Sequence, residues 1–167
     1  NCVGGGSSAY GFWSEFIDYD KKQIELIGVE AGGPKNSTLH AAPLSRGAKI
    51  GILHGAASYV CQNNEGQINA TESISAGLDY PGVSPIHCYL KDTKRARYTY
   101  ATDEDALKAH VMVTKFEKLN PSLEPSHAFA EAIKIAPKLS KDTIIIVNSC
   151  GDAKKDRDIL RERLGKN

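Results

Sequence analysis

Glycine and small hydroxyl side chains gather near the start of the chain, where the sequence reads CVGGGSSAYGF from Cys2. Backbone N–H groups in a glycine-rich turn that opens onto a helix form an anion site, because their dipoles converge and no Cβ blocks close approach. The hydroxyls of Ser7 and Ser8 are further donors. The residues therefore suit a phosphate group, and a purely structural turn is an equally good interpretation of the glycines alone.

Two classes of phosphate ligand fit this loop. Gly4, Gly6 and Ala9 have the G-x-G-x-x-A spacing of dinucleotide-binding domains, and Glu30 follows about 20 residues later, where an acid could meet a ribose. Only Asn1, Cys2 and Val3 precede the glycines, which is short for the usual first strand. Pyridoxal phosphate would use the same loop without needing Glu30, so both ligands stay open on the residues alone.

The amino-acid composition argues against several classes of function. The 167 residues carry 21 Lys+Arg against 20 Asp+Glu, and this balance argues against a nucleic-acid or membrane-surface role. No apolar run approaches the roughly 18 residues of a membrane span. The four cysteines contain no C-x-x-C pair, so we expect reduced thiols rather than a zinc site.

The elements that would position the loop alternate between strands and helices. A helix is expected after an N-cap at Ser8, and another after a capping box at Thr102 and Asp105. Further expected helices cover 125–138 and the charged tail. Strands are expected at 23–30, at 49–53, in a hairpin around the turn at 63–66, and at 96–102.

The segment DTIIIVNSCG, residues 142–151, is apolar enough to predict a strand buried on both faces. Alternation of strands and helices predicts an α/β fold with a mostly parallel sheet flanked by helices. Ligands bind such sheets at the carboxyl ends of the strands. We therefore expect residues 4–8 and 149–151 to lie together at one edge.

Several stretches together resemble one family. CVGGGSSA, ELIGVE, GQINATESISAGLDYPGVSP, LEPSHAFAEAI and IIIVNSCG are similar to the C-terminal part of the tryptophan synthase β chain, in that family's order and nearly its spacing. The resemblance runs from Cys2 to about Asp156, and SISAGLDYPGVSP is its most specific segment.

The resemblance implies a pyridoxal-phosphate lyase of fold type II, which joins L-serine and indole to make L-tryptophan. It implies that the whole chain, residues 1–167, is the cofactor-binding second part of a longer protein, and that the catalytic lysine lies in the first part. The isolated chain would then be inactive. Implied partners are the first part, a second β chain and the tryptophan synthase α chain, in the cytoplasm, with neither nucleic acid nor membrane.

Other functions remain open beside this one. A related lyase could replace the β-substituent of serine or cysteine by another nucleophile. A nicotinamide-binding domain would use the same glycines. A non-catalytic interaction module is a further alternative, because the sequence departs from the family at several functional positions.

By resemblance, Gly4, Gly5, Gly6, Ser7 and Ser8 form the cofactor's phosphate cup, with Ser8 where the family usually has Asn. Glu124 matches the glutamate beside the cofactor ring, although an acid at a helix N-terminus is favoured by the dipole in any case. Asp79 matches the acid that contacts the substrate's β-hydroxyl. As a plain structural residue it would be a turn former.

Cys150 aligns with a serine that faces the pyridine nitrogen, and a shift of one residue would put Ser149 there instead. At the end of an apolar strand, burial is expected to raise the pKa of Cys150 and keep it a thiol. A neutral partner favours β-elimination and replacement over transamination.

The carbonyls of Gly4, Tyr80 and Gly82 match a site for a monovalent cation, Na⁺ or K⁺. Leu53 and His54 replace an aromatic pair that lines the family's indole tunnel.

Overall fold

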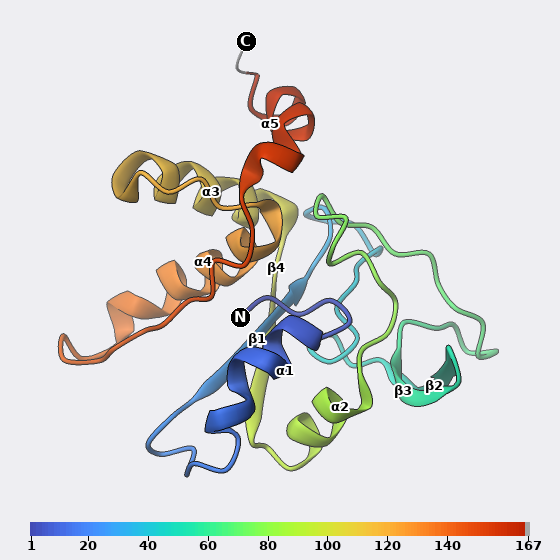
Figure 1. The fold of residues 1–167 in the computed structure, drawn as a ribbon. Coiled ribbons are helices and arrows are strands. Elements are labelled where there is room, and N and C mark those ends of the chain that lie inside the picture. Colours follow the sequence, from blue (N-terminus) through green and yellow to red (C-terminus); the bar gives the residue numbers. More distant parts are fainter. Residues whose placement is uncertain (166–167) are drawn as a thin grey trace.

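Two parallel strands, β1 (Leu26–Ala31) and β4 (Ala96–Ala101), form the centre of the fold in the computed structural model, which describes residues 1–165 (Figure 1). The start of the chain adds to this sheet. Cys2 forms a parallel bridge with Val29, and the Val3 N–H donates to the Val29 carbonyl at 2.8 Å. The expected α/β class and the parallel pairing at its centre are confirmed.

Successive residues of β1 pack on opposite faces of this sheet, as the period of two requires. Leu26 joins a cluster with Trp13 of α1 (Ser7–Trp13) and Leu90 of α2 (Pro85–Asp92). Val29 joins a second cluster with Ala128 of α4 (Leu123–Ile135). Each face of the sheet therefore has its own helices.

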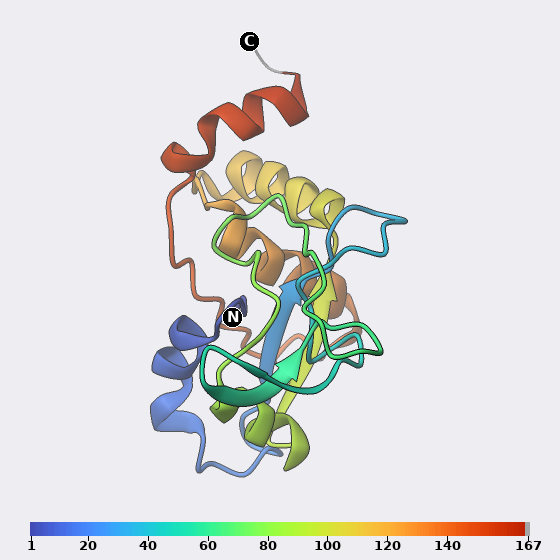
Figure 2. The ribbon, with the colours of Figure 1, turned by 90° about the vertical axis from the view of Figure 1, so that its right-hand side faces the viewer.

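The remaining helices lie around this core. α3 (Asp103–Glu117) packs against α4, and α5 (Arg157–Leu164) lies at the far end of the molecule beyond α3 (Figures 1 and 2). Short 3₁₀ turns are found at Ser14–Phe16, Ala136–Lys138 and Ala153–Asp156.

The capping prediction for α3 is confirmed and that for α1 is wrong. Asp105 N donates to Thr102 Oγ1 at 3.2 Å, and Thr102 N donates to Asp105 Oδ2 at 3.2 Å. α1 instead begins at Ser7, with Gly6 as its N-cap at a φ of 99°. Ser8 lies inside the helix, because only glycine takes this left-handed conformation at little cost.

The predicted hairpin around residues 63–66 is also wrong in its strands. β2 (Lys49–Leu53) pairs antiparallel with β3 (Ala56–Val60). The turn between them is His54–Gly55, where both residues have positive φ, 50° and 78°. A two-residue turn of this kind matches the twist of the strands. The turn at 63–66 closes only a single bridge, Gln62 to Ile68.

Residues 142–151 do not form the predicted buried strand. Ile144 is 84% exposed and Ile146 is 70% exposed, and the segment runs without helix or strand. An apolar composition favours a strand, but a strand also needs a neighbour to receive its N–H and C=O groups. Within residues 1–165 this segment has no neighbouring strand to pair with.

No helix within the described residues is long and apolar enough to cross a membrane.

Candidate functional site

The glycine loop approaches the rest of the protein closely on one side and is open on the other. A Cβ at Gly4 would lie 2.6 Å from the Gly77 carbonyl oxygen, and one at Gly6 would overlap the ring of His87. A Cβ at Gly5 would have no atom within 4 Å, and Ser7 and Ser8 are exposed. The first N–H groups of α1 have no acceptor within the helix. The loop is therefore closed on the side of Gly77 and His87 and accessible on the side of Gly5, Ser7 and Ser8.

His87 fixes the glycine loop by a hydrogen bond to its backbone. Its Nε2 donates to the Gly6 carbonyl at 2.7 Å, and its Nδ1 accepts from the Tyr98 hydroxyl at 2.8 Å. The imidazole is fully buried, and burial lowers its pKa although the bond to Gly6 opposes this. Because the ring donates one hydrogen bond and accepts another, the imidazole must be neutral. Sequence reasoning missed this role, because no spacing pattern links His87 to the glycines.

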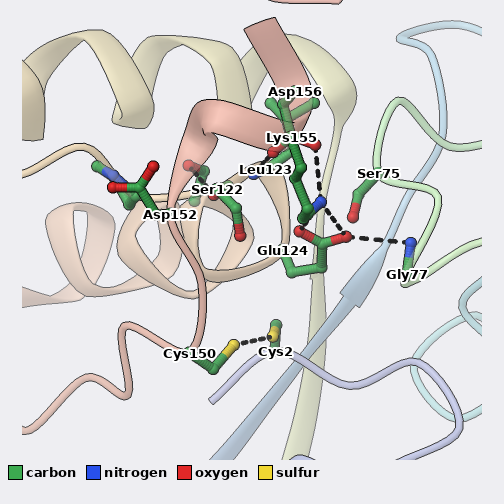
Figure 3. A network of polar contacts seen from close by, with 12 residues as sticks. Cys2, Ser75, Gly77, Ser122, Leu123, Glu124, Cys150, Asp152, Lys155 and Asp156 are labelled. Atoms are coloured by element: carbon green, nitrogen blue, oxygen red, sulfur yellow. Dashed lines mark hydrogen bonds and ion pairs between the residues drawn. The ribbon is translucent and has the colours of Figure 1, made fainter.

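Glu124, the second residue of α4, lies beside the same loop across the turn at Gly77. Its Oε1 accepts from the Gly77 N–H at 3.1 Å and from Lys155 Nζ at 2.9 Å, and Lys155 also contacts Oε2 at 2.8 Å (Figure 3). Burial would raise the carboxyl pKa, but the bond from Lys155 and bonds from the backbone and Ser122 lower it to about 2. Glu124 is therefore a carboxylate at neutral pH. Lys155 was not among the predicted site residues.

Replacing Lys155 by methionine should raise the pKa of Glu124 from about 2, because the ion pair is lost while burial, which raises the pKa, remains. The lowered pKa contributes stability above pH 4.5 that is lost as the pH falls toward 2. The variant should lose this acid sensitivity. Carbon-detected NMR titration of the Glu124 carboxyl checks the shift, with Lys154→Met as the exposed neighbouring control. An unchanged Glu124 titration would contradict the assignment.

Cys150 lies against the segment 1–3 that leads into the glycine loop. Its Sγ is 3.7 Å from the Sγ of Cys2 (Figure 3). The expectation of a buried thiol with a raised pKa is wrong: Cys150 is exposed, and a hydrogen bond from Cys2 lowers its pKa to about 6. The physical reason is that residues 142–149 are not covered as a central strand would be. Ser149 is exposed too, but Cys150 is the residue that contacts Cys2.

The other expected site residues line the neighbouring turn. Asp79 is exposed, and Tyr80 and Gly82 line a cleft of about 320 Å³ that also contains Gly5. His54 Nδ1 lies 2.8 Å from the Tyr80 hydroxyl, at the edge of this cleft. The structure thus brings the glycine loop and the turn at 79–82 together. A larger hollow of about 460 Å³, between residues 17–21 and 89–95, contains none of the expected site residues.

Glu30 is not available to a ribose. Its side chain is 1% exposed, and its carboxylate accepts from Leu44 N at 3.0 Å, Ser45 N at 2.7 Å and Ser45 Oγ at 2.5 Å. All three hydrogen bonds that this carboxylate accepts come from the loop after β1. The structure therefore argues against the nicotinamide-binding interpretation, which needs this acid at the surface.

Burial raises the pKa of Glu30 to about 7, against the three bonds that favour its ionised form. The group then contributes stability that is complete below pH 4.5 and lost as the pH rises through 7. We expect the free energy of unfolding to fall relative to Glu30→Gln by on the order of 3 kcal/mol across this window. Urea titrations of both chains at several pH values check this. A difference that stays flat, or grows with pH, would show that the three donors outweigh burial.

Known proteins resemble the chain in sequence and in fold. No protein-family model matches the chain. Tryptophan synthase beta chains of Bordetella parapertussis, Bordetella bronchiseptica and Bordetella petrii are each 49% identical to it over 164 residues, 98% of this chain and 40% of theirs. The fold is similar to a crystal structure of a fungal L-serine ammonia-lyase from Rhizomucor miehei, with a TM-score of 0.67 and 21% identity over 99% of this chain and 48% of that one. The chain is thus a homologue of the tryptophan synthase beta chains and spans about 40% of their length.

Proposed function

We propose that this chain is the phosphate-binding part of a pyridoxal-phosphate lyase that replaces the hydroxyl of L-serine by indole and releases L-tryptophan. The observation that carries the proposal is 49% identity over 98% of the chain to tryptophan synthase beta chains. Because the chain spans 40% of those relatives, we further propose that the lysine that binds the cofactor lies outside these 167 residues.

The residues present fit pyridoxal phosphate. Gly5, Ser7 and Ser8 form the open side of the loop, where N–H and hydroxyl donors can surround a phosphate. Gly4 and Gly6 cannot carry side chains without striking Gly77 or His87, so the loop is held in its bent form before any ligand arrives. Preorganised donors bind an anion without the cost of ordering them.

When bound, the cofactor would stabilise negative charge at the α-carbon of the amino acid. Glu124 would place a fixed carboxylate beside the 3-oxygen side of the ring, kept ionised by Lys155. Cys150 would lie at the pyridine nitrogen, in the place of the family's serine to which it aligns. Asp79, exposed at the turn, would contact the β-hydroxyl of serine as that group leaves.

The proposed cation site, partners and compartment rest on the resemblance to tryptophan synthase β chains. We propose Na⁺ or K⁺ at the carbonyls of Gly4, Tyr80 and Gly82, since hard cations prefer oxygen ligands. As partners we propose the remaining part of the β chain, a second β chain and the tryptophan synthase α chain. As a biosynthetic enzyme it would act in the cytoplasm.

The test is a chimera in which this chain replaces the matching 40% of the Bordetella petrii beta chain. We expect it to retain pyridoxal phosphate on dialysis and to form tryptophan from serine and indole, whereas the 167-residue chain alone forms none. Retained cofactor with pyruvate as the only product would favour a different lyase. Tryptophan synthesis by the isolated chain would overturn the proposed division of the site.

Cys150→Ser and Cys150→Asp in the same chimera test the ring contact. The serine variant should keep tryptophan synthesis, because it restores the hydroxyl that the family has at this position. The aspartate should hold a proton on the ring nitrogen and admit transamination, detected as pyridoxamine phosphate. If Cys150→Asp leaves the products unchanged while Ser149→Ala abolishes activity, Ser149 is the ring partner.

A further inference from the structure

Two thiols that are 148 residues apart in the sequence meet beside the glycine loop. Cys2 Sγ and Cys150 Sγ lie 3.7 Å apart (Figure 3). A disulfide needs about 2.05 Å between the sulfurs, so closing the pair requires a small approach. The other two thiols have different neighbours: Cys61 Sγ lies 3.9 Å from His40 Nδ1, and Cys88 Sγ lies 3.4 Å from Tyr59 N.

The two sides of the pair differ in how firmly they are held. Cys2 is 4% exposed and bridges Val29 of the central sheet. Cys150 is exposed, and residues 142–149 before it have no helix or strand. On its other side the chain is fixed, because Ser122 N donates to the Gly151 carbonyl at 2.9 Å. The approach of the sulfurs can therefore come from the segment that precedes Cys150.

The two thiols also differ in their chemistry. The bond to Cys150, together with burial, raises the pKa of Cys2, and the same contact lowers the pKa of Cys150 to about 6. At neutral pH Cys150 is thus the thiolate and Cys2 carries the proton. The thiolate is the form that reacts with oxidants, and an accessible thiolate beside a second thiol is the arrangement of redox-sensing cysteines.

We propose that Cys2 and Cys150 are a redox-sensitive dithiol that closes to a disulfide in the presence of a peroxide. The Cys150 thiolate attacks one peroxide oxygen, an S–O bond forms, the O–O bond breaks and the leaving oxygen departs as water after taking a proton. Cys2 then loses its proton and attacks the Cys150 sulfur, the S–O bond breaks and a second water leaves. Two thiols are oxidised and one hydrogen peroxide is reduced to two waters.

Oxidation of Cys150 makes the attack by Cys2 easier. Part of what keeps Cys2 protonated is the charge of the neighbouring thiolate, and that charge is gone once Cys150 carries oxygen. The disulfide would link the segment before Cys150 to residues 1–3, which precede the glycine loop. If Cys150 contacts the cofactor ring as proposed above, oxidation also removes that contact, but formation of the disulfide does not depend on the proposed function.

The experiment treats the 167-residue chain with one equivalent of hydrogen peroxide at pH 7. We expect the thiol count to fall from four to two, with Cys2 and Cys150 peptides linked in the mass spectrum and both thiols restored by dithiothreitol. Cys150→Ser should slow the loss of the Cys2 thiol by more than about tenfold, because Cys2 alone is protonated at neutral pH. Cys61→Ser and Cys88→Ser, as matched controls, should leave the rate unchanged.

A second measurement does not depend on the crosslink. Alkylation of Cys150 by iodoacetamide should follow a titration with a midpoint near pH 6 in the unmodified chain, and the midpoint should rise in Cys2→Ser. Overoxidation of Cys150 without a link to Cys2, disulfide-linked dimers in place of the internal bond, or equal loss of all four thiols would each overturn the proposal.

Discussion

Gly6→Ala should destabilise the chain by about 2–5 kcal/mol and abolish cofactor retention in the chimera. Alanine pays roughly 1–2 kcal/mol for a left-handed conformation, and Gly6 has a φ of 99°. Its new Cβ would also overlap the His87 ring, which is fully buried and has no room to swing aside. Overpacking of this kind typically costs a further 1–3 kcal/mol. Urea unfolding of the chain and dialysis of the chimera measure the two effects.

Gly5→Ala is the matched control for this prediction. It adds the same methyl group to the neighbouring residue, where no atom lies within 4 Å. We expect a change in stability below about 1 kcal/mol, as for most exposed substitutions. Equal destabilisation by Gly5→Ala and Gly6→Ala would show that the contact with His87 is not the cause, because a Cβ at Gly5 meets no atom within 4 Å.

His87→Phe should be the next most damaging change, at about 2–4 kcal/mol. Phenylalanine keeps a planar ring but removes the donor to the Gly6 carbonyl and the acceptor for the Tyr98 hydroxyl. Each buried group left without a partner costs about 1–3 kcal/mol. The loop would also lose the bond that fixes Gly6, so cofactor retention in the chimera should weaken. Denaturant unfolding and dialysis again give the two values.

Tyr98→Phe separates the two bonds of His87. It removes only the hydroxyl that donates to Nδ1, and the bond from Nε2 to Gly6 remains. We expect a loss of about 1 kcal/mol with cofactor retention unchanged. Equal loss of cofactor in Tyr98→Phe and His87→Phe would mean that packing around the ring, rather than the bond to Gly6, shapes the loop.

The sequence alone predicted the local features of this protein. The segment QIELIGVE indicated β1, and the capping box at Thr102 and Asp105 placed the start of α3 where it is found. Such signals depend on residues a few positions apart, which meet whatever the rest of the chain does. The resemblance of the chain to tryptophan synthase beta chains is confirmed, because three of them are 49% identical to it over 98% of its length.

Local signals failed where a distant neighbour decides. The apolar run at 142–149 predicted a buried strand, but within residues 1–165 it has no strand to pair with and Ile144 is 84% exposed. The turn at 63–66 has good hairpin residues, yet β2 pairs across His54–Gly55, because Ala56–Val60 follows directly and packs beside α2. Pairing energy, rather than turn propensity, selected the hairpin.

The tertiary structure alone decided which groups meet at the site. Gly6 and His87 are 81 residues apart, Glu124 and Lys155 are 31 apart, and Cys2 and Cys150 are 148 apart. No periodicity in the sequence links such pairs. They meet because the parallel sheet brings the start of the chain and loops from distant parts of the sequence to the same edge. The sequence determined which side chains could do chemistry here, and the closure of these long loops determined their partners, their burial and hence their pKa values.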